Sequence, residues 1–453
     1  MSHTPLASEP LKPSRAELRW LVLLLIVSGL LRVGVICWKP ASLAEDRDLY
    51  WGIAERLAAG DGFQHPSLGH ATAYRPPLYP LILARIIAWD GRVFGLAVVQ
   101  TGFSVATVWL TYSLGRSLSL GRCSMIAAAF VAANPLLVHA NSQAMTETVC
   151  TFLIIAALRL ATAIHNVAVR KREFSALMHT LGFADNELDP RTNWSLLKPF
   201  GLGLLCGLAA LTRPTVLAFV ALAAAIVILR QLCRGRPTRA WFANVVVASI
   251  TFGLTLAPWG IRNALEFGTP IITTTHGGYT LLLGNNDEAY REEVAKPFGT
   301  LWDSRLWQNS LEEDLRAAGI APHDELARDR WMSQRAWEWI SQHPREFAAA
   351  CWLRVRRFWN INPAGSDATA MPRVIRWGTA AFFVLELTMA AIGLWRLRRD
   401  DWSAWWPLVV LIISFSAVHL VYWSNLRMRA PIEPVLALLA AFAVSRCRGT
   451  SQT

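Results

Sequence analysis

Long apolar stretches alternate with short polar connections along most of this chain. Ten of them approach or reach the roughly 20 apolar residues that a helix needs to cross the hydrocarbon layer of a bilayer. They lie near residues 18–38, 93–113, 123–139, 144–164, 198–212, 214–231, 241–259, 377–395, 404–422 and 430–446. The pattern predicts an all-α membrane bundle with about 10 to 12 spans, among which 123–139 and 198–212 are short.

Composition agrees with this interpretation. Of the 453 residues, 53% are hydrophobic and only 17% are charged, and the mean hydropathy is +0.32. This is far more apolar side chain than one soluble core buries, so we expect a multi-pass membrane protein. No phosphate-binding glycine loop, H-E-x-x-H or C-x-x-C motif occurs in the sequence.

The net charge of +12 comes from Lys and Arg in alternate connections, which excludes the single basic face of a nucleic-acid-binding protein. These residues are Lys12, Arg15, Arg19, Arg116, Arg122, Arg170, Lys171, Arg172, Arg230, Arg234, Arg236, Arg239, Arg396, Arg398, Arg399, Arg446 and Arg448. The positive-inside rule makes their loops cytoplasmic. Both termini are then cytoplasmic, and residues 40–92, 140–143, 213, 260–376 and 423–429 face outward, on the periplasmic side of an inner membrane.

The first outer segment, 40–92, begins with an acidic cluster and continues as a predicted surface helix. Tyr50, Ile53, Ala54 and Leu57 recur at helical spacing, and Gly60 is a stop signal. Farther along, an apolar stretch at 78–88 is too short to span a bilayer, and we expect an interfacial helix there.

The second large outer segment, 260–376, contains turn signals followed by amphipathic stretches near 311–318 and 324–358. The expected organisation is an N-terminal membrane module at 1–259, an outer helical cap at 260–376 and C-terminal spans at 377–453. Trp352, with Arg354 and Arg356 nearby, predicts an amphipathic helix lying on the outer membrane surface.

Asp46 and Asp48 are the first candidates for chemistry. An ionised carboxylate at the mouth of a bundle suits a general base, and crowded acids beside an apolar span favour a raised pKa. Two other interpretations stay open. Asp46 also suits the N-cap of the predicted helix, and an Asp-x-Asp pair in extended chain suits a divalent cation. Because a helical pattern starts here, the base is favoured over the metal.

Glu147 is the second acidic candidate, at the outer start of the fourth apolar stretch. Ionisable groups at membrane depth are costly and usually have a partner or a function. The alternative explanation is that a carboxylate at a helix N-terminus interacts favourably with the helix dipole.

Arginines in outer segments are the more specific signal, because the positive-inside rule disfavours them there. A shared anionic ligand, such as a lipid phosphate, explains the set, since the planar guanidinium suits phosphate. Ion pairs with Asp46, Asp48 or Glu147 are the alternative for any single member. The arginines concerned are Arg75, Arg213, Arg262, Arg427 and Arg429.

Several loose motifs follow one another in a fixed order. They are Asp46-x-x-x-Tyr50, Ala54-x-x-Leu57-x-x-Gly60-x-Gly62, Arg75-Pro76-Pro77-Leu78-Tyr79-Pro80, Thr146-Glu147, Leu211-Thr212-Arg213-Pro214, Pro258-Trp259-x-x-Arg262-Asn263, Gly284-Asn285-Asn286 and Arg427-x-Arg429-x-Pro431-x-x-Pro434. The ordered set, spanning about 18–446, resembles GT-C fold membrane glycosyltransferases, the bacterial group of protein O-mannosyltransferases and lipid A aminoarabinose transferases.

This resemblance implies a hexosyl- or pentosyltransferase. Its donor would be a polyprenyl-phosphate sugar, and its acceptor a lipid, a glycan or a protein. Asp46 would be the catalytic base of an inverting displacement, with Asp48 and Glu147 as further catalytic acids. The implied substrate-binding residues are Tyr50, Arg75, Arg213, Arg262, Asn263, Arg427 and Arg429. Arg47 follows Asp46 where many relatives have Glu or Ser, which leaves the use of a divalent cation open.

Two other functional classes remain at this point. A transporter or flippase for a lipid-linked anionic substrate would also place charges in a helical bundle, although such proteins usually show two related halves. A non-catalytic assembly partner would use the outer segment as a docking surface.

Overall fold

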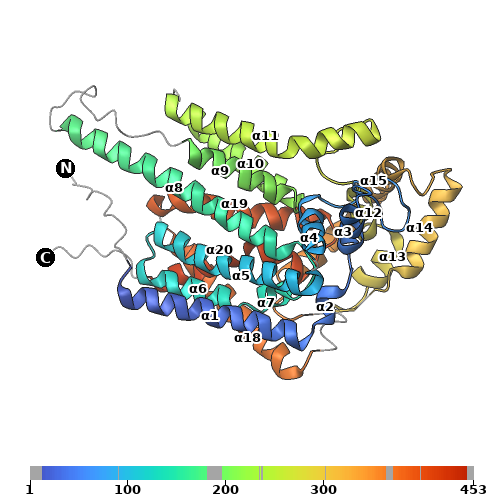
Figure 1. Ribbon diagram of the computed structural model, residues 1–453, viewed down its shortest axis with the longest axis horizontal. Coiled ribbons are helices and arrows are strands. Elements are labelled where there is room, and N and C mark those ends of the chain that lie inside the picture. Colours follow the sequence, from blue (N-terminus) through green and yellow to red (C-terminus); the bar gives the residue numbers. More distant parts are fainter. Residues whose placement is uncertain are drawn as a thin grey trace.

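A computed structural model describes residues 13–89, 91–180, 196–233, 235, 238–300, 302–363, 371–397 and 399–445. Long helices pack side by side in a bundle, and shorter helices cover one end of it (Figure 1). Lys12, Arg234, Arg236, Arg398, Arg446 and Arg448, which entered the topology prediction, lie outside the described residues. The all-α fold class is confirmed.

Seven helices of the described chain are long and apolar enough to cross a membrane. They belong to α1 (Arg15–Trp38), α5 (Arg92–Ser117), α8 (Glu147–Thr180), α10 (Thr215–Leu232), α11 (Arg239–Phe267), α18 (Arg373–Arg396) and α19 (Arg399–Val421). The short 3-10 turn η1 (Gly121–Cys123) leads into α6 (Ser124–Ala133), which joins α7 (Pro135–Asn141) at a bend of 51°, and the pair counts as an eighth crossing if it forms one bent span.

The remaining two predicted stretches are helical but short. α9 (Leu197–Ala210) has 14 residues and α20 (Glu433–Val444) has 12, which correspond to rises of about 21 and 18 Å. Neither covers the hydrocarbon thickness of about 30 Å alone. The described residues therefore hold seven or eight full-length crossings where the sequence predicts about ten to twelve, because α9 and α20 are too short to cross alone.

Small residues allow the bundle helices to approach closely. A Cβ at Gly393 would collide with the Leu439 carbonyl of α20, and one at Gly203 would collide with the Ala248 carbonyl of α11. Such backbone contacts are typical of helix association in membranes. As a result α20, rich in alanine and leucine, is almost completely buried at the centre of the bundle.

The end of the bundle remote from Arg15 and Arg19, called the outer end after the topology predicted from the sequence, carries the shorter helices. They are α2 (Ala41–Ala44), α3 (Tyr50–Ala59), α4 (Leu78–Ala88), α12 (Gly277–Gly284), α13 (Asp287–Ala289), the π-helical turn η3 (Tyr290–Val294), α14 (Arg305–Ala317), α15 (Glu325–Gln342) and α16 (Pro344–Phe358). The predicted helix at 50–57 and its stop are confirmed, because α3 ends at Gly60 with a φ of 89°.

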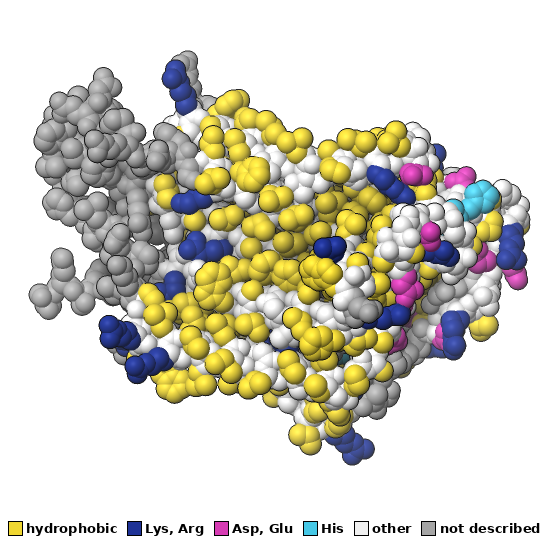
Figure 2. All heavy atoms as spheres, viewed as in Figure 1, with side chains coloured by type: hydrophobic (Ala, Val, Ile, Leu, Met, Phe, Trp, Pro, Cys, Tyr) yellow, Lys and Arg dark blue, Asp and Glu magenta, His cyan; other side chains and the backbone are white. Residues whose placement is uncertain are grey.

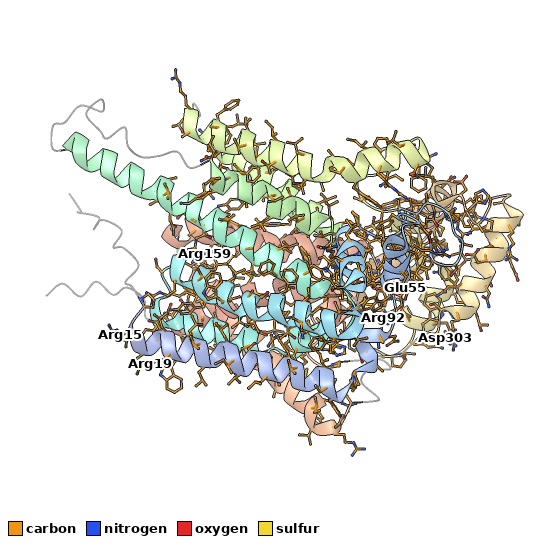
Figure 3. The ribbon with its side chains drawn as sticks, in the orientation of Figure 1. Arg15, Arg19, Glu55, Arg92, Arg159 and Asp303 are labelled. Atoms are coloured by element: carbon orange, nitrogen blue, oxygen red, sulfur yellow. The ribbon has the colours of Figure 1, made fainter. Side chains whose placement is uncertain are left out.

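The two ends of the bundle differ in charge. Acidic side chains gather around the outer helices, whereas apolar side chains cover the visible flank of the bundle (Figure 2). Arg15 and Arg19 lie at the opposite end from Glu55, Arg92 and Asp303 (Figure 3). The bundle is therefore polarised in the sense expected for a membrane protein with a basic cytoplasmic side.

Arg354 of α16 departs from the predicted surface helix. Trp352 is 64% exposed, but Arg354 is buried and donates hydrogen bonds to Leu420 O at 2.8 Å and Asn285 Oδ1 at 2.9 Å. It also donates to Gly284 O. Arg354 thus anchors α16 to the backbone and side chain at the end of α12, at Gly284 and Asn285.

Candidate active site

Three arginines and two carboxylates from distant segments meet at the outer end of the bundle. Arg427 Nε lies 3.1 Å from Glu147 Oε1, and Arg213 Nη1 lies 3.3 Å from the same oxygen. Arg427 Nη2 also approaches Asp48 Oδ2 at 3.7 Å, and Arg75 Nη2 is 2.9 Å from Asp48 Oδ1. With three cations and two anions, the cluster retains a net positive charge toward a further anion.

Glu147 is the buried centre of this cluster. It is the first residue of α8, and only 1% of its side chain is exposed. Its Oε2 has no hydrogen-bond partner among the described residues. The helix N-terminus and the two guanidinium groups together stabilise a carboxylate that burial alone would strongly destabilise.

Arg213 and Arg427 are brought to Glu147 by two tight connections. Arg213 lies in the short turn between α9 and α10, and Arg427 lies on the 3-10 segment η4 (Leu426–Ile432) that leads into α20. The end of α9 and the start of α20 therefore place both guanidinium groups at the mouth of the bundle.

Arg75 is fixed by Asp48 and by two aromatic rings. Its Nε donates to Asp48 O at 2.8 Å, and its guanidinium lies 5.5 Å from the Tyr50 ring and 4.9 Å from the Tyr74 ring. Burial opposes the charged form, but Tyr50, Asp48, Tyr74 and Asp46 raise the pKa of Arg75 above its ordinary value. This arginine is a permanent cation.

Asp46 is exposed and caps the first turn of α3. Its Oδ1 accepts from Trp51 N at 3.1 Å and its Oδ2 from Gly52 N at 2.8 Å. A Cβ on Gly52 would lie 2.5 Å from Pro66 Cγ and 3.3 Å from Asp46 Oδ2, so only glycine allows this approach. Asp46 is not the N-cap residue, which is Leu49, but its carboxylate accepts two amides of the first turn of α3 and is thereby held in a defined position at the solvent edge.

A strained backbone separates Asp46 from Tyr50. Leu49 has a φ of 63° and a ψ of 12°, a left-handed conformation that is unfavourable for a residue with a branched side chain. Such strain commonly occurs at functional sites, where surrounding contacts over-determine the backbone. Here the turn sends Asp48 toward Arg75 and Asp46 toward α3.

Arg262 and Asn263 lie outside the charged cluster. Arg262 Nη1 donates to Thr72 O at 2.8 Å, and its Nη2 donates to Phe63 O at 2.8 Å. Asn263 Nδ2 donates to Ile271 O at 2.8 Å. Both side chains hold backbone carbonyls, and Arg262 thereby fixes the first outer segment from the end of α11.

Arg429 is also separate from the cluster, although it lies two residues after Arg427. It is fully buried, its Nε is 2.5 Å from Glu433 Oε1, and its Nη1 donates to Asn360 O at 3.0 Å. Glu433 in turn accepts from Asn134 Nδ2 at 2.7 Å, and the same amide donates to Glu386 at 3.2 Å. This buried network holds η4 in the bundle.

Glu325 of α15 is an important residue that the sequence did not single out. It is buried and accepts from Ala73 N at 2.9 Å and from Thr275 Oγ1 at 2.7 Å, and it also accepts from Thr72 Oγ1. One carboxylate therefore joins the outer cap to the segment that carries Arg75. No local pattern reveals a contact between residues about 250 positions apart.

Aromatic side chains continue from Arg75 into the outer cap. The rings of Tyr74 and His276 are 4.3 Å apart, and His276 stacks on Tyr279 at 5.2 Å. Burial, and to a smaller extent the charge of Arg75, hold the pKa of His276 well below its ordinary value. The imidazole is therefore neutral at physiological pH.

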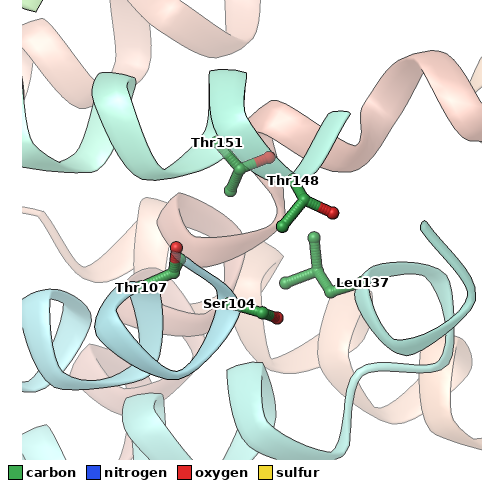
Figure 4. Close-up of a pocket in the computed structure, with 5 residues that line it drawn as sticks. All are labelled: Ser104, Thr107, Leu137, Thr148 and Thr151. Atoms are coloured by element: carbon green, nitrogen blue, oxygen red, sulfur yellow. The ribbon is translucent and has the colours of Figure 1, made fainter. Parts of the chain in front are cut away.

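A small polar cavity lies near Glu147. It is lined by Ser104 and Thr107 of α5, Leu137 of α7, and Thr148 and Thr151 of α8 (Figure 4). Its volume of about 10 Å³ holds one water molecule at most. It is therefore too small for a substrate.

The metal prediction rests on Asp46 and Asp48 alone. The described residues contain no group of three or more His, Cys, Asp or Glu side chains arranged to hold a metal ion. Asp46 accepts from two backbone amides and Asp48 from Arg75. The oxygens of these two carboxylates thus face protein donors, and the use of a divalent cation stays a prediction.

No protein-family model and no curated protein matches the sequence, whereas solved membrane-enzyme structures match the fold. The oligosaccharyltransferase of Archaeoglobus fulgidus in its apo form gives a TM-score of 0.52 at 16% identity, over 95% of this chain and 51% of that one. AglB of the same organism, with an inhibitory peptide and a dolichol-phosphate, gives 0.51 at 15% identity, over 95% and 51%.

A weaker likeness is to ArnT from Cupriavidus metallidurans bound to undecaprenyl phosphate, with a TM-score of 0.41 at 12% identity over 94% of this chain and 78% of that one. The chain spans about half the length of the oligosaccharyltransferase structures. The match covers nearly every helix described above. The protein thus has the GT-C fold of membrane glycosyltransferases.

Proposed function

We propose that this protein is a glycosyltransferase that moves a sugar from a polyprenyl-phosphate carrier to a lipid, glycan or protein acceptor at the outer face of the inner membrane. The observation that carries the proposal is the net positive arginine cluster beside the fixed, exposed carboxylate of Asp46. The fold supports it, because a structure that shares this fold holds a dolichol-phosphate.

The donor phosphate is assigned to Arg75, Arg213 and Arg427. Arginine binds phosphate oxygens in a planar, bidentate manner and keeps its charge at any physiological pH. Asp48 and Glu147 pair with the three guanidinium groups and so gather them at one end of the bundle. A phosphate at the headgroup depth of a bilayer completes the charge balance of this cluster.

The reaction is a direct displacement with inversion. The acceptor hydroxyl or amine attacks the anomeric carbon while Asp46 accepts its proton. The bond between the anomeric carbon and the phosphate oxygen breaks, and the electron pair leaves with the lipid phosphate, whose charge the arginines stabilise. Arg262, Asn263 and Arg429 contribute indirectly by holding the first outer segment and η4.

The orientation in the membrane is part of the proposal. Arg15 and Arg19 lie at the end of the bundle remote from the outer helices (Figure 3), and basic termini favour the cytoplasmic side. The cluster and Asp46 then face the periplasm, where lipid-linked sugars are consumed without nucleotides.

The test is a comparison of cell-envelope glycolipids and glycoproteins by mass spectrometry. Cells lacking the gene are complemented with the wild type, with Asp46→Asn or with Glu45→Gln, a neighbouring exposed acid. Asparagine still accepts an α3 amide, so the fold persists. We expect the sugar mass to be lost in the deletion, restored by the wild type and Glu45→Gln, and reduced about 100-fold or more by Asp46→Asn.

Full restoration by Asp46→Asn would remove Asp46 from the role of base. A deletion that changes which side of the membrane a glycolipid occupies, without changing any mass, would instead indicate a flippase.

A further inference from the structure

The outer cap contains a groove of about 500 Å³. It lies between the ends of α12 and α13 on one side and α14 and α15 on the other, and it has the size of pockets that bind small molecules or short peptides. Two features of its lining decide what it binds: the carboxylates Asp287, Glu288, Asp314 and Glu338, and the indoles Trp307 and Trp339.

The groove is acidic in a chain whose net charge is +12. Four carboxylates line it against two guanidinium groups. The latter are paired at 3.6 Å with Glu288 and Glu338. Asp314 is exposed, and its carboxylate has no partner among the described residues. The groove therefore attracts a cation, whereas the arginine cluster attracts an anion.

The indoles are not open platforms for a sugar ring. Trp339 stacks on His343 at 4.3 Å, packs against Tyr290 at 4.1 Å and donates to Asp287 Oδ1 at 2.9 Å. Trp307 is only 8% exposed. With their faces occupied, these rings form rigid walls, and charge is the recognition element that remains.

An unbroken series of ring contacts connects the groove with the active site. Trp307 lies 6.1 Å from Tyr279, which stacks on His276 at 5.2 Å. His276 contacts Tyr74 at 4.3 Å, and Tyr74 packs under the Arg75 guanidinium. A ligand in the groove thus sits on the same rigid wall that positions Arg75.

We propose that this groove binds a basic segment of a polypeptide acceptor, with a lysine ammonium held by Asp314 and Glu338. The inference rests on the proposed glycosyl transfer and names the acceptor class. Opposite charges on the two substrates keep the anionic donor at the arginines and the cationic acceptor at the groove. Walls without a free aromatic face favour a peptide over a glycan.

The test measures binding directly and so does not depend on turnover. The probe is a fluorescent Ser- and Gly-rich pentapeptide with a central lysine, and fluorescence anisotropy reports its affinity for the full-length protein in nanodiscs. The same peptide with acetyl-lysine removes the charge, and a glucosamine trimer tests an amino-glycan. A double variant, Asp314→Asn combined with Glu338→Gln, removes the two acids proposed to hold the lysine. Its control is Glu313→Gln, which changes an exposed acid on α14 outside the groove.

We expect the double variant and the acetylated peptide each to bind about tenfold more weakly or worse, with Glu313→Gln unchanged and with affinity falling as salt increases. Equal binding of both peptides, an equal effect of Glu313→Gln, or capture of the glucosamine trimer alone would overturn the inference. If the peptide binds as expected but envelope sugars do not depend on Asp46, the groove stands and the proposed transfer fails.

Discussion

Arg427 and Arg429 lie two residues apart on η4, yet their guanidinium groups occupy opposite environments. Arg427 is 24% exposed and reaches Asp48 and Glu147, whereas Arg429 is fully buried against Glu433. In a 3-10 turn, positions two apart point in different directions. One turn of backbone thus directs Arg427 toward the charged cluster and Arg429 into the buried core.

Replacing Arg427 tests the ligand role. We expect Arg427→Gln to reduce transfer by about 100- to 1,000-fold, as for the loss of one donor to a developing oxyanion, with a smaller fall in melting temperature than Arg429→Met, because Glu147 keeps Arg213 as a partner. Arg427→Lys keeps the charge but loses the planar fork and should recover part of the rate. Activity in membranes and thermal unfolding of the purified protein give the two readouts. If the loss of transfer activity is matched by an equally severe loss of thermal stability, Arg427 has a structural role.

Replacing Arg429 tests the fold role. Arg429→Met leaves Glu433 buried without its cation, and removing one partner of a buried ion pair costs about 3–5 kcal/mol. The combined Arg429→Met and Glu433→Gln variant removes both charges and should recover much of that loss. The measurement is the thermal unfolding of both proteins in detergent. A single variant as stable as the wild type would contradict this assignment.

The hydrogen bonds of Glu325 should couple the stability of the outer cap to that of the first outer segment. Glu325→Gln weakens its hydrogen bonds with Thr72, Ala73 and Thr275, and leaving buried donors poorly matched costs about 1–3 kcal/mol. Hydrogen exchange should accelerate around residues 63–75 and transfer should slow. Glu312→Gln, which breaks only the surface pair with Arg328, is the control and should change neither quantity measurably.

A substitution at Gly52 tests whether transfer depends on the exact position of the Asp46 carboxylate. The methyl group of Gly52→Ala would press on Pro66 and on the Asp46 carboxylate, so the cap must shift. We expect transfer to fall by about tenfold or more, because small misplacements of reacting groups are costly. Gly34→Ala on α1 places its methyl group in open space and serves as the matched control. Unchanged activity in Gly52→Ala would show that the exact carboxylate position is unimportant.

The lowered pKa of His276 should make the stability of the folded protein depend on pH. Its pKa lies well below the ordinary 6.5, so below about pH 6.5 the unfolded chain takes up a proton that the folded protein does not. The stability that the folded protein gains from keeping His276 neutral is fully present above about pH 6.5 and is lost as the pH falls. His276→Gln should flatten the decline in melting temperature between about pH 7 and 5 relative to the wild type. If the melting temperature of the variant falls with pH as steeply as that of the wild type, groups other than His276 cause the decline.

The sequence predicted the helices well because periodicity and apolar length are local properties. Each of the ten apolar stretches is mostly helical over its described residues, and α3 ends at the predicted Gly60. The count of full crossings was less accurate, since α9 and α20 are shorter than their apolar stretches.

The site was only partly predictable. The unexpected outer arginines identified the region, and three of the five meet there. Arg262 and Arg429 carry the same sequence signal but bind carbonyls and Glu433, because side-chain direction depends on tertiary packing. The contacts of Glu325 and His276 join segments far apart in the chain, which periodicity and motifs do not report.

The length of α11 has a consequence for the depth of the chemistry. Its 29 residues rise about 43 Å, some 13 Å more than the hydrocarbon thickness of a typical bilayer. In the proposed orientation, the final turns, with Arg262, extend beyond the hydrocarbon layer and support the segment that carries Arg75. We expect lipids with longer or shorter acyl tails to shift these turns relative to the proposed lipid carrier, so that membrane thickness affects how the protein and the carrier meet.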